Sequence, residues 1–246
     1  MHLLERIVEQ PHSCAYLARE RASLELRVMV DVSTPELEAM LERGWRRFGP
    51  VYFRPICGSC SECVSLRVMV DAFTPTKSQR RAARAQRRLR RLVGAPRVDA
   101  DRVALYAKWH AERERLRGWA PNPQSLDRYA LEFAFPHPAA REAAFYDDAN
   151  GGRLVGVGLF DETPHALSAV FFFRDPAYAH LSLGTSNVLA LIDDARASGR
   201  AHVYLGYRVS GCASLTYKAA FRPHELLRDR PGAGHEAVWK REAADV

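Results

Sequence analysis

The chain has 246 residues and a formal net charge of +7, from 36 Lys and Arg against 29 Asp and Glu. A 47% hydrophobic and 26% charged composition is that of a folded globular protein, which excludes disordered, collagen-like and disulfide-scaffold classes. The apolar stretches 163–173 and 182–192 are too short to cross a bilayer, and residues 1–10 do not form a secretory signal. We therefore expect a cytoplasmic protein with reduced cysteines and no membrane partner.

The first half of the chain predicts two strands and several helices. Apolar and polar residues alternate over residues 24–32 and 64–70, as in half-buried strands. A helix is expected to start at the N-cap Thr34, with Pro35 in its first turn, and to run to about Arg47. Two further helices are expected over residues 99–117 and 125–135.

The second half predicts mainly strands. Residues 142–147 and 154–160 are expected to form a hairpin through Asn150-Gly151, and residues 166–173 a central strand. A helix over 185–198, a strand over 202–207, a short helix near 215–221 and a strand near 224–227 follow. This order favours an α+β fold in which helices cover a mixed sheet, with one domain over residues 1–95 and a second over 96–246.

Residues 77–97 carry the entire positive excess. They contain nine bases and no acid, and the rest of the chain has 27 bases against 29 acids. The apolar positions Ala85, Leu89, Leu92 and Val93 predict one amphipathic helix. Because like charges at this density repel one another, we expect a nucleic-acid backbone to neutralise them, with a solvated helix face as the alternative. The candidate contacts are Lys77, Arg80, Arg84, Arg87, Arg88 and Arg91.

Four of the five cysteines suggest a cofactor site. Cys57, Cys60 and Cys63 form a C-x2-C-x2-C run, and Cys14 would complete a set of four if its segment packs beside residues 64–70. Four thiolates suit zinc and an iron–sulfur cluster equally, so both stay open, beside the alternative of unconnected reduced thiols. Cys212 is remote in sequence and is interpreted as a structural or substrate-lining thiol.

Motifs in a fixed order along the chain resemble the aminoacyl-tRNA–protein transferases. The resemblance is closest to the bacterial branch, which moves leucine onto acidic amino termini, whereas the eukaryotic branch moves arginine. The matching stretches are CAYL at 14–17, YFRPICGSCSECVSLRVMV at 52–70, SQRR at 78–81, LSAVFFFRDP at 167–176, SLGT at 182–185 and YLGYRVSGCASLTYKAAFRP at 204–223. Departures at residues 84–86, at Trp109-His110 and at Ser186 concern the aminoacyl group and the acceptor more than the fold.

The resemblance implies a small Cys-bearing N-terminal domain followed by a GNAT-like acyltransferase domain with a mixed, mostly antiparallel sheet. The implied reaction transfers an aminoacyl group from tRNA to the α-amine of proteins that begin with Asp or Glu, which marks them for degradation through the N-degron pathway. Since an amide is more stable than the tRNA ester, no cofactor is required for the chemistry, and no DNA partner is expected. The acceptor carboxylate needs a cation, for which Lys218 and Arg222 are the candidates and Arg81 a third.

A polar lining around the reacting groups is also expected. Tyr207, Ser210 and Asp175 are the candidate catalytic residues, and Tyr217 a candidate substrate contact. Three other functions stay open: an arginyl-tRNA–protein transferase, a non-enzymatic zinc-dependent nucleic-acid-binding protein, and an acetyl-CoA acetyltransferase. Residues 178–184 lack the Gln/Arg-x-x-Gly-x-Gly/Ala loop that cradles the CoA pyrophosphate, which disfavours the last.

Overall fold

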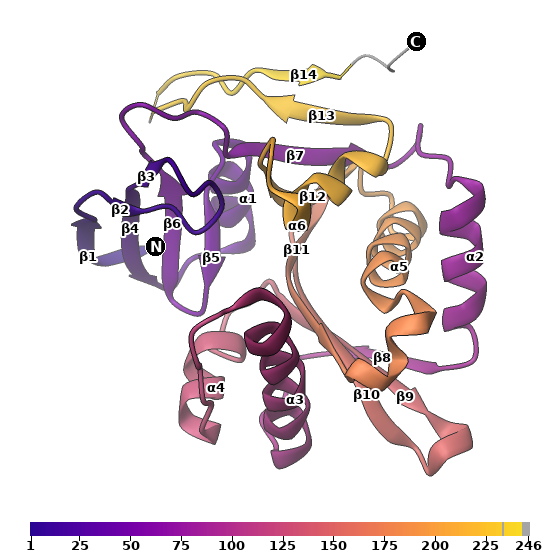
Figure 1. The fold of residues 1–246 in the computed structure, drawn as a ribbon. Coiled ribbons are helices and arrows are strands. Elements are labelled where there is room, and N and C mark those ends of the chain that lie inside the picture. Colours follow the sequence, from indigo (N-terminus) through magenta and orange to yellow (C-terminus); the bar gives the residue numbers. More distant parts are fainter. Residues whose placement is uncertain (233, 243–246) are drawn as a thin grey trace.

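The computed structural model, which describes residues 1–232 and 234–242, contains a smaller and a larger β-sheet (Figure 1). The smaller sheet has four antiparallel strands in the order β1–β4–β6–β5. Their bounds are β1 His2–Val8, β4 Leu24–Val30, β5 Arg46–Phe48 and β6 Val51–Pro55, and a separate ribbon joins β2 His12–Ser13 to β3 Arg21–Ala22. Helix α1, Thr34–Glu42, connects β4 to β5.

The larger sheet has eight strands in the order β14–β13–β7–β12–β11–β10–β9–β8. Their bounds are β14 Trp239–Arg241, β13 His224–Leu227, β7 Val64–Met69, β12 His202–Arg208, β11 Ala166–Arg174, β10 Arg153–Glu162, β9 Ala140–Asp147 and β8 Arg90–Gly94. Only β11 and β12 pair in parallel, which confirms the mixed, mostly antiparallel sheet. Since β7 and β8 belong to this sheet, the two sheets do not divide the chain at residue 95.

Strands β11 and β12 separate soon after they begin. They pair only from Ala166–Ser168 to His202–Tyr204, after which β11 leads past α3 whereas β12 leads to α6 (Figure 1). The register of β11 against β10 slips between Leu159 and Phe160, which leaves Val170 as a bulged residue. Beyond Ser168, the edge of β11 that faced β12 has no strand partner, so other groups must satisfy its backbone.

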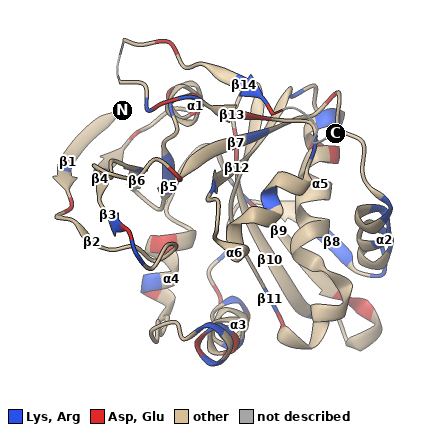
Figure 2. Ribbon diagram, turned by 45° about the horizontal axis from the view of Figure 1, so that its top comes forward, with Lys and Arg blue, Asp and Glu red and all other residues tan. Residues whose placement is uncertain are grey.

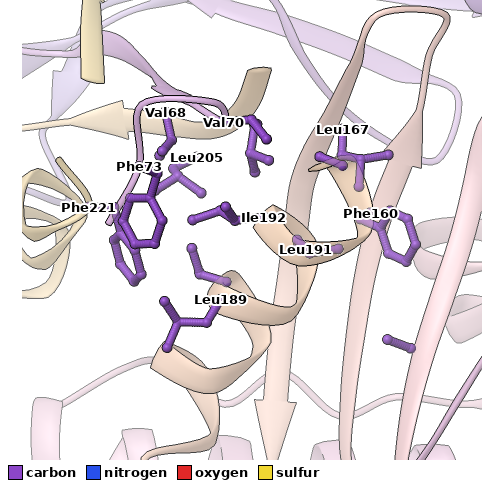
Figure 3. Close-up of a cluster of buried hydrophobic side chains, with 14 of the residues drawn as sticks. Val68, Val70, Phe73, Phe160, Leu167, Leu189, Leu191, Ile192, Leu205 and Phe221 are labelled. Carbon is purple, nitrogen blue, oxygen red and sulfur yellow. The ribbon is translucent and has the colours of Figure 1, made fainter. Parts of the chain in front are cut away.

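Helices cover both faces of the larger sheet. Helix α5, Leu183–Ala197, buries Leu191 and Ile192 in one apolar cluster with Val68 of β7 and Leu205 of β12 (Figure 3), and α2, Lys77–Gln86, packs on α5. Helices α3, Ala100–Arg117, and α4, Leu126–Phe133, lie on the opposite face, where Phe173 joins their apolar cluster. Short helices complete the fold: η1 Asp148–Asn150, η2 Pro176–Leu181, α6 Ala213–Thr216 and η3 Tyr217–Ala220.

The basic segment is not one helix, which corrects the prediction for residues 77–97. Helix α2 ends at Gln86, and residues 90–94 form the edge strand β8, where Leu92 and Val93 are 45% and 50% exposed. The guanidinium of Arg90 binds Asp148, and that of Arg91 binds Asp194. Pairing with β9 and these two ion pairs therefore replace the expected helical stripe.

Three local predictions also need correction. The N-cap of α1 is Ser33, which forms a capping box with Glu36, and α1 ends at Glu42 because residues 46–48 pair with β6 instead. The turn between β9 and β10 is longer than a two-residue hairpin turn. It contains η1, which Asp147 caps, and then Gly151 and Gly152, both with positive φ.

Candidate functional site

Two cations from distant parts of the chain meet where β11 and β12 separate. Lys218 of η3 donates from Nζ to the carbonyl oxygen of Tyr207 at 2.8 Å, and Arg46 of β5 donates to the carbonyl oxygen of Ala169 on the unpaired edge of β11. Both cations border Gly206, whose φ is +80°. A Cβ at Gly206 would lie 3.4 Å from Lys218 Nζ and 3.6 Å from Arg46 Nε. Glycine is thus needed here for its backbone conformation and because the cations approach so closely.

These two cations have no carboxylate partner among the residues that the structure describes. Arg46 is only 8% exposed, and Lys218 is half-buried. Burial and the charge of Arg46 together lower the pKa of Lys218 to about 7. Because buried charges are normally paired, an uncompensated pair of this kind favours an anionic ligand, and the fork of donors on Arg46 suits a carboxylate.

Tyr207, a predicted catalytic residue, has its hydroxyl committed to the backbone. The phenol donates to the carbonyl oxygen of Gly44 at 2.7 Å, and burial raises its pKa. The hydroxyl therefore fastens the end of β12 to the smaller sheet and is not placed as a base. The carbonyl group of Tyr207, in contrast, holds Lys218 in the site.

Tyr207 and Ser210 line a cavity of about 460 Å³ together with Cys63. Ser210 is exposed on the turn after β12. Five arginines border the same cavity against three acids: Arg43, Arg54, Arg208, Arg228 and Arg230, with Glu62, Asp229 and Glu242. The sequence analysis missed these arginines because they come from segments that only the fold brings together.

The structure does not bring Asp175 to the two cations. Its carboxylate is 4% exposed, forms an ion pair with Arg153, and lies 3.8 Å from Lys108. It also accepts from the backbone N–H of Ala177 and so caps η2. Asp175 sits at the far end of β11, and its contacts within the described chain do not reach Lys218, so a structural role accounts for its burial.

The other predicted substrate contacts surround Lys218 less closely. Tyr217 is 49% exposed beside it. Arg222 donates to the carbonyl oxygen of Ala219 at 3.3 Å and lies 3.4 Å from Glu242, so its charge is already compensated. Lys218 is therefore the better placed of the two predicted acceptor cations, and Arg46 is the partner that the sequence analysis did not find.

Helix α2 begins next to η3. The side chain of Gln79 donates from Nε2 to the carbonyl oxygen of Ala220 at 3.1 Å, two residues beyond Lys218. Arg81 faces a groove of about 280 Å³ between α2 and the start of α5, which Ser182 and Thr185 also line. The basic helix and the Lys218 region are thus neighbours, as the predicted delivery of a bound nucleic acid to that region requires.

Most of the predicted nucleic-acid contacts are exposed. Figure 2 shows Lys and Arg positions gathered along α2, at an outer edge of the molecule. In the described part of the chain, no ion pair engages Lys77, Arg80, Arg84, Arg87 or Arg88. Arg91 is a correction, because it is half-buried and lies 3.1 Å from Asp194, so its charge is compensated within the protein. Five of the six predicted contacts are therefore free to meet a polyanion.

The four predicted cysteine ligands lie in one region. Cys63 interacts electrostatically with Cys14, Cys57 and Cys60, and burial with these neighbours raises its pKa to about 12. The loop is held by Arg230, which donates to the carbonyl oxygens of Cys57 at 3.0 Å and Cys60 at 2.7 Å. As the side chains are placed, no three or more His, Cys, Asp or Glu of the described residues form a metal-binding group. Cys212 is buried, and Tyr16 interacts electrostatically with it as well as with Cys63.

Comparisons with known proteins identify two matching regions. Residues 12–81 match the family described as "Arginine-tRNA-protein transferase, N terminus", and residues 101–228 the one described as "Arginine-tRNA-protein transferase, C terminus". The chain is 35% identical to an aspartate/glutamate leucyltransferase of Aeromonas salmonicida, over 88% of this chain and 89% of that protein. It is 30% identical to one of Campylobacter jejuni (strain 81-176), over 93% and 95%.

Among solved structures, the chain is similar to FemX, with a TM-score of 0.50 and 10% identity over 81% of this chain and 68% of FemX. At this identity the similarity concerns the fold alone. It agrees with the predicted GNAT-like domain, which has a mixed, mostly antiparallel sheet. No helix in residues 1–232 or 234–242 is long and apolar enough to span a membrane.

Proposed function

Because this chain belongs to the family of aminoacyl-tRNA–protein transferases, and is thus an aminoacyltransferase, we propose that it moves leucine from leucyl-tRNA onto proteins that begin with Asp or Glu. The acceptor atom is the α-amine of the protein, and the product carries a new N-terminal leucine. Such a residue would direct the protein to N-degron-dependent degradation. Relatives that match almost their whole length are named for this activity, which favours leucine over arginine as the donor.

The observation that carries the proposal is the uncompensated pair Arg46 and Lys218. An N-terminal Asp or Glu brings a carboxylate close to its α-amine, and the pair offers two cations at one point beside Gly206. Binding the carboxylate there satisfies charges that the fold leaves unpaired, whereas Asn or Gln would leave them unpaired. Selection of acidic termini follows from this difference.

The proposed reaction requires few catalytic groups from the protein. The α-amine, whose ordinary pKa is about 7.7–8.0, attacks the ester carbonyl, the amide bond forms, and the 3′-oxygen of the tRNA leaves and takes up a proton. An ester is converted to an amide, so no ATP or redox cofactor enters. Holding the amine and the ester together supplies most of the acceleration, which accords with Tyr207 being committed to structure.

The exposed face of α2 is the proposed binding surface for the tRNA. Lys77, Arg80, Arg84, Arg87 and Arg88 would contact its phosphates. The first turn of α2 lies beside η3, so a strand that follows this face reaches the Lys218 region. The requirement for charged tRNA puts the reaction in the cytoplasm, and no DNA partner is needed.

We also propose that Cys14, Cys57, Cys60 and Cys63 hold zinc or an iron–sulfur cluster with a structural role. The fit rests on the chemistry of four thiols gathered around Cys63, on a backbone N–H from Tyr16 to Cys14 Sγ at 3.4 Å, and on the clamp by Arg230. The group would fix residues 57–63 against the smaller sheet. Metal analysis and an ultraviolet–visible spectrum of anaerobically purified protein distinguish zinc, a cluster and free thiols.

A transfer assay tests the main proposal. Radiolabelled leucyl-tRNA and arginyl-tRNA are each offered with peptides that begin with Asp, Glu, Asn or Gln. We expect leucine transfer to the Asp and Glu peptides only. Transfer of arginine in preference to leucine would assign the arginyl reaction instead, and tight tRNA binding without transfer from either donor would point to a non-enzymatic RNA-binding protein.

A further inference from the structure

Aromatic rings in successive contact continue from the two cations to α3. We call Phe53, Phe48, Phe171, Trp109 and Trp119 the aromatic strip. Successive ring centroids are 6.0 Å apart for Phe53 and Phe48, 5.8 Å for Phe48 and Phe171, 5.4 Å for Phe171 and Trp109, and 5.7 Å for Trp109 and Trp119. The rings come from β6, β5, β11, α3 and the segment after α3.

The strip begins at the cation pair. Phe53 stands directly opposite Arg46 in the β5–β6 ladder, and Phe48 is two residues further along β5, so all three side chains share one face. Phe53 also contacts the ring of Tyr207, 6.5 Å between centroids, and the carbonyl group of Tyr207 holds Lys218. On β11, Phe171 follows Ala169, whose carbonyl group Arg46 binds, by two residues.

Much of this apolar surface is accessible. Phe48, Phe53 and Phe171 are half-buried and Trp119 is 46% exposed, whereas Trp109 is buried and backs the strip from the core. Partly exposed aromatic rings beside uncompensated charges indicate a ligand with an apolar and an anionic part.

We infer that the aromatic strip binds the leucyl side chain of the donor, and that it selects leucine over arginine. The inference rests on the proposed function. When the α-amine of an acidic terminus attacks the ester, the donor's side chain lies within about 10 Å of the acceptor's carboxylate. A carboxylate held by Arg46 and Lys218 therefore places that side chain on Phe53, Phe48 or Phe171.

The charges around the strip disfavour an arginyl donor. The nearby carboxylates already have partners: Glu112 binds Arg113 at 2.7 Å, Glu114 binds His110 at 2.8 Å, and Glu132 binds Arg128 at 2.7 Å. A guanidinium on the strip would find these three carboxylates already engaged and would be repelled by Arg46. Leucine, in contrast, buries its isobutyl group against rings without leaving a charge unpaired.

To test this inference, the same tRNA is charged with leucine, alanine or arginine, and kcat/KM is measured for transfer of each amino acid to an Asp peptide. For the unmodified enzyme we expect leucine to exceed alanine at least about tenfold. Phe48→Ala and Phe53→Ala should lower this ratio about tenfold, whereas the Asp-to-Asn acceptor ratio stays unchanged. Phe53→Leu, which preserves packing, should restore most of it. Tyr146→Ala, a half-buried ring on β9 outside the strip, serves as the matched control.

Binding gives a readout that does not depend on transfer. The probes are 3′-deoxyadenosines that carry leucine, alanine or arginine in a stable 3′-amide, and their affinity is followed by the fluorescence of Trp109 and Trp119. Tighter binding of the leucyl probe, lost in Phe53→Ala, supports the inference. Equal affinity for the three probes overturns it even if the enzyme is inactive. If both alanine variants transfer leucine with the same leucine-to-alanine ratio as the unmodified enzyme, the proposed role of the aromatic strip is wrong, whereas the proposed function stands.

Discussion

Consecutive arginines on β5 meet opposite electrostatic environments. Arg47 forms a two-point ion pair with Asp161 of β10, where Arg47 Nε lies 3.2 Å from Oδ2, and the side chains are 6% and 1% exposed. Arg46 is as deeply buried, but its hydrogen bond goes to a carbonyl oxygen, Asp161 acts on it without forming an ion pair in the described chain, and the cation Lys218 lies beside it. Both arginines reach the larger sheet, but since alternate residues of a strand face opposite ways, Arg47 is neutralised there whereas Arg46 faces the site. Burial alone therefore does not tell whether a charged side chain has a structural or a functional role. The partner of the charge must be known as well.

Removing Arg47 should have the largest effect on stability. Arg47→Ala leaves Asp161 buried without a partner, which costs about 3–5 kcal/mol. For a chain of this size that corresponds to a Tm lower by roughly 6–20 °C in thermal unfolding. The double variant Arg47→Ala, Asp161→Ala should lose less than the sum of the single variants. A Tm within 2 °C of the unmodified protein, on the order of 0.5 kcal/mol, would contradict the structural role.

Removing Arg46 should instead damage acceptor recognition. Arg46→Ala loses a charge-assisted contact worth about 1.5–3 kcal/mol, so KM for an Asp peptide should rise roughly 10–150-fold. Its Tm should change little, because the lost bond to Ala169 is offset by the removal of an uncompensated charge. Peptide kinetics and thermal unfolding of Arg46→Ala and Arg47→Ala, measured side by side, sharpen the comparison. A stability loss in Arg46→Ala equal to that in Arg47→Ala would break it.

The unpaired state of Lys218 predicts a pH dependence. Its pKa of about 7 follows from burial and from Arg46, while Cys212 and Cys63 face it and act in the opposite direction. Lys218 is charged below its pKa and loses its charge as the pH rises. Affinity for the acidic acceptor should therefore fall about tenfold per pH unit above pH 7 in the free enzyme. Lys218→Arg should move this loss to higher pH. If transfer occurs and the KM for the acceptor peptide does not change between pH 6 and 9, the placement of Lys218 at the acceptor carboxylate is wrong.

The same contrast between paired and unpaired arginines applies, more weakly, to the basic segment. Arg84→Gln and Arg87→Gln remove exposed charges and should each reduce the salt slope of tRNA binding by about one. Arg91→Gln removes a charge that Asp194 already compensates and should leave the slope unchanged. Filter binding between 50 and 200 mM salt, on the order of the range where counterion release is steep, compares the three variants. Equal reductions of the salt slope in all three variants would show that the ion pair with Asp194 does not keep Arg91 from contacting the tRNA.

Much of the fold could be predicted from local patterns. Alternation marked β4 and β7, a continuous apolar run marked β11, and Asp99 and Ser125 cap the expected α3 and α4. The short strands β5, β6 and β8 were missed, because so few apolar residues leave too little periodicity and their pairing partners supply the stability. The largest error of prediction concerned β8. In the sequence its arginines resemble the end of a basic helix, and only the fold places Asp148 and Asp194 beside them.

The sequence by itself determined the family, most strands of the larger sheet, the single basic segment and Lys218 as a cation near the end of β12. Each of these depends on residues that are neighbours in the chain. Only the tertiary structure decided that Arg46 joins Lys218, that Arg47 and Arg91 are neutralised, and that Phe53 and Phe48 lie beside Phe171. The physical reason is that the role of a charge or a ring depends on its neighbours in space, and here those neighbours lie more than a hundred residues away along the chain.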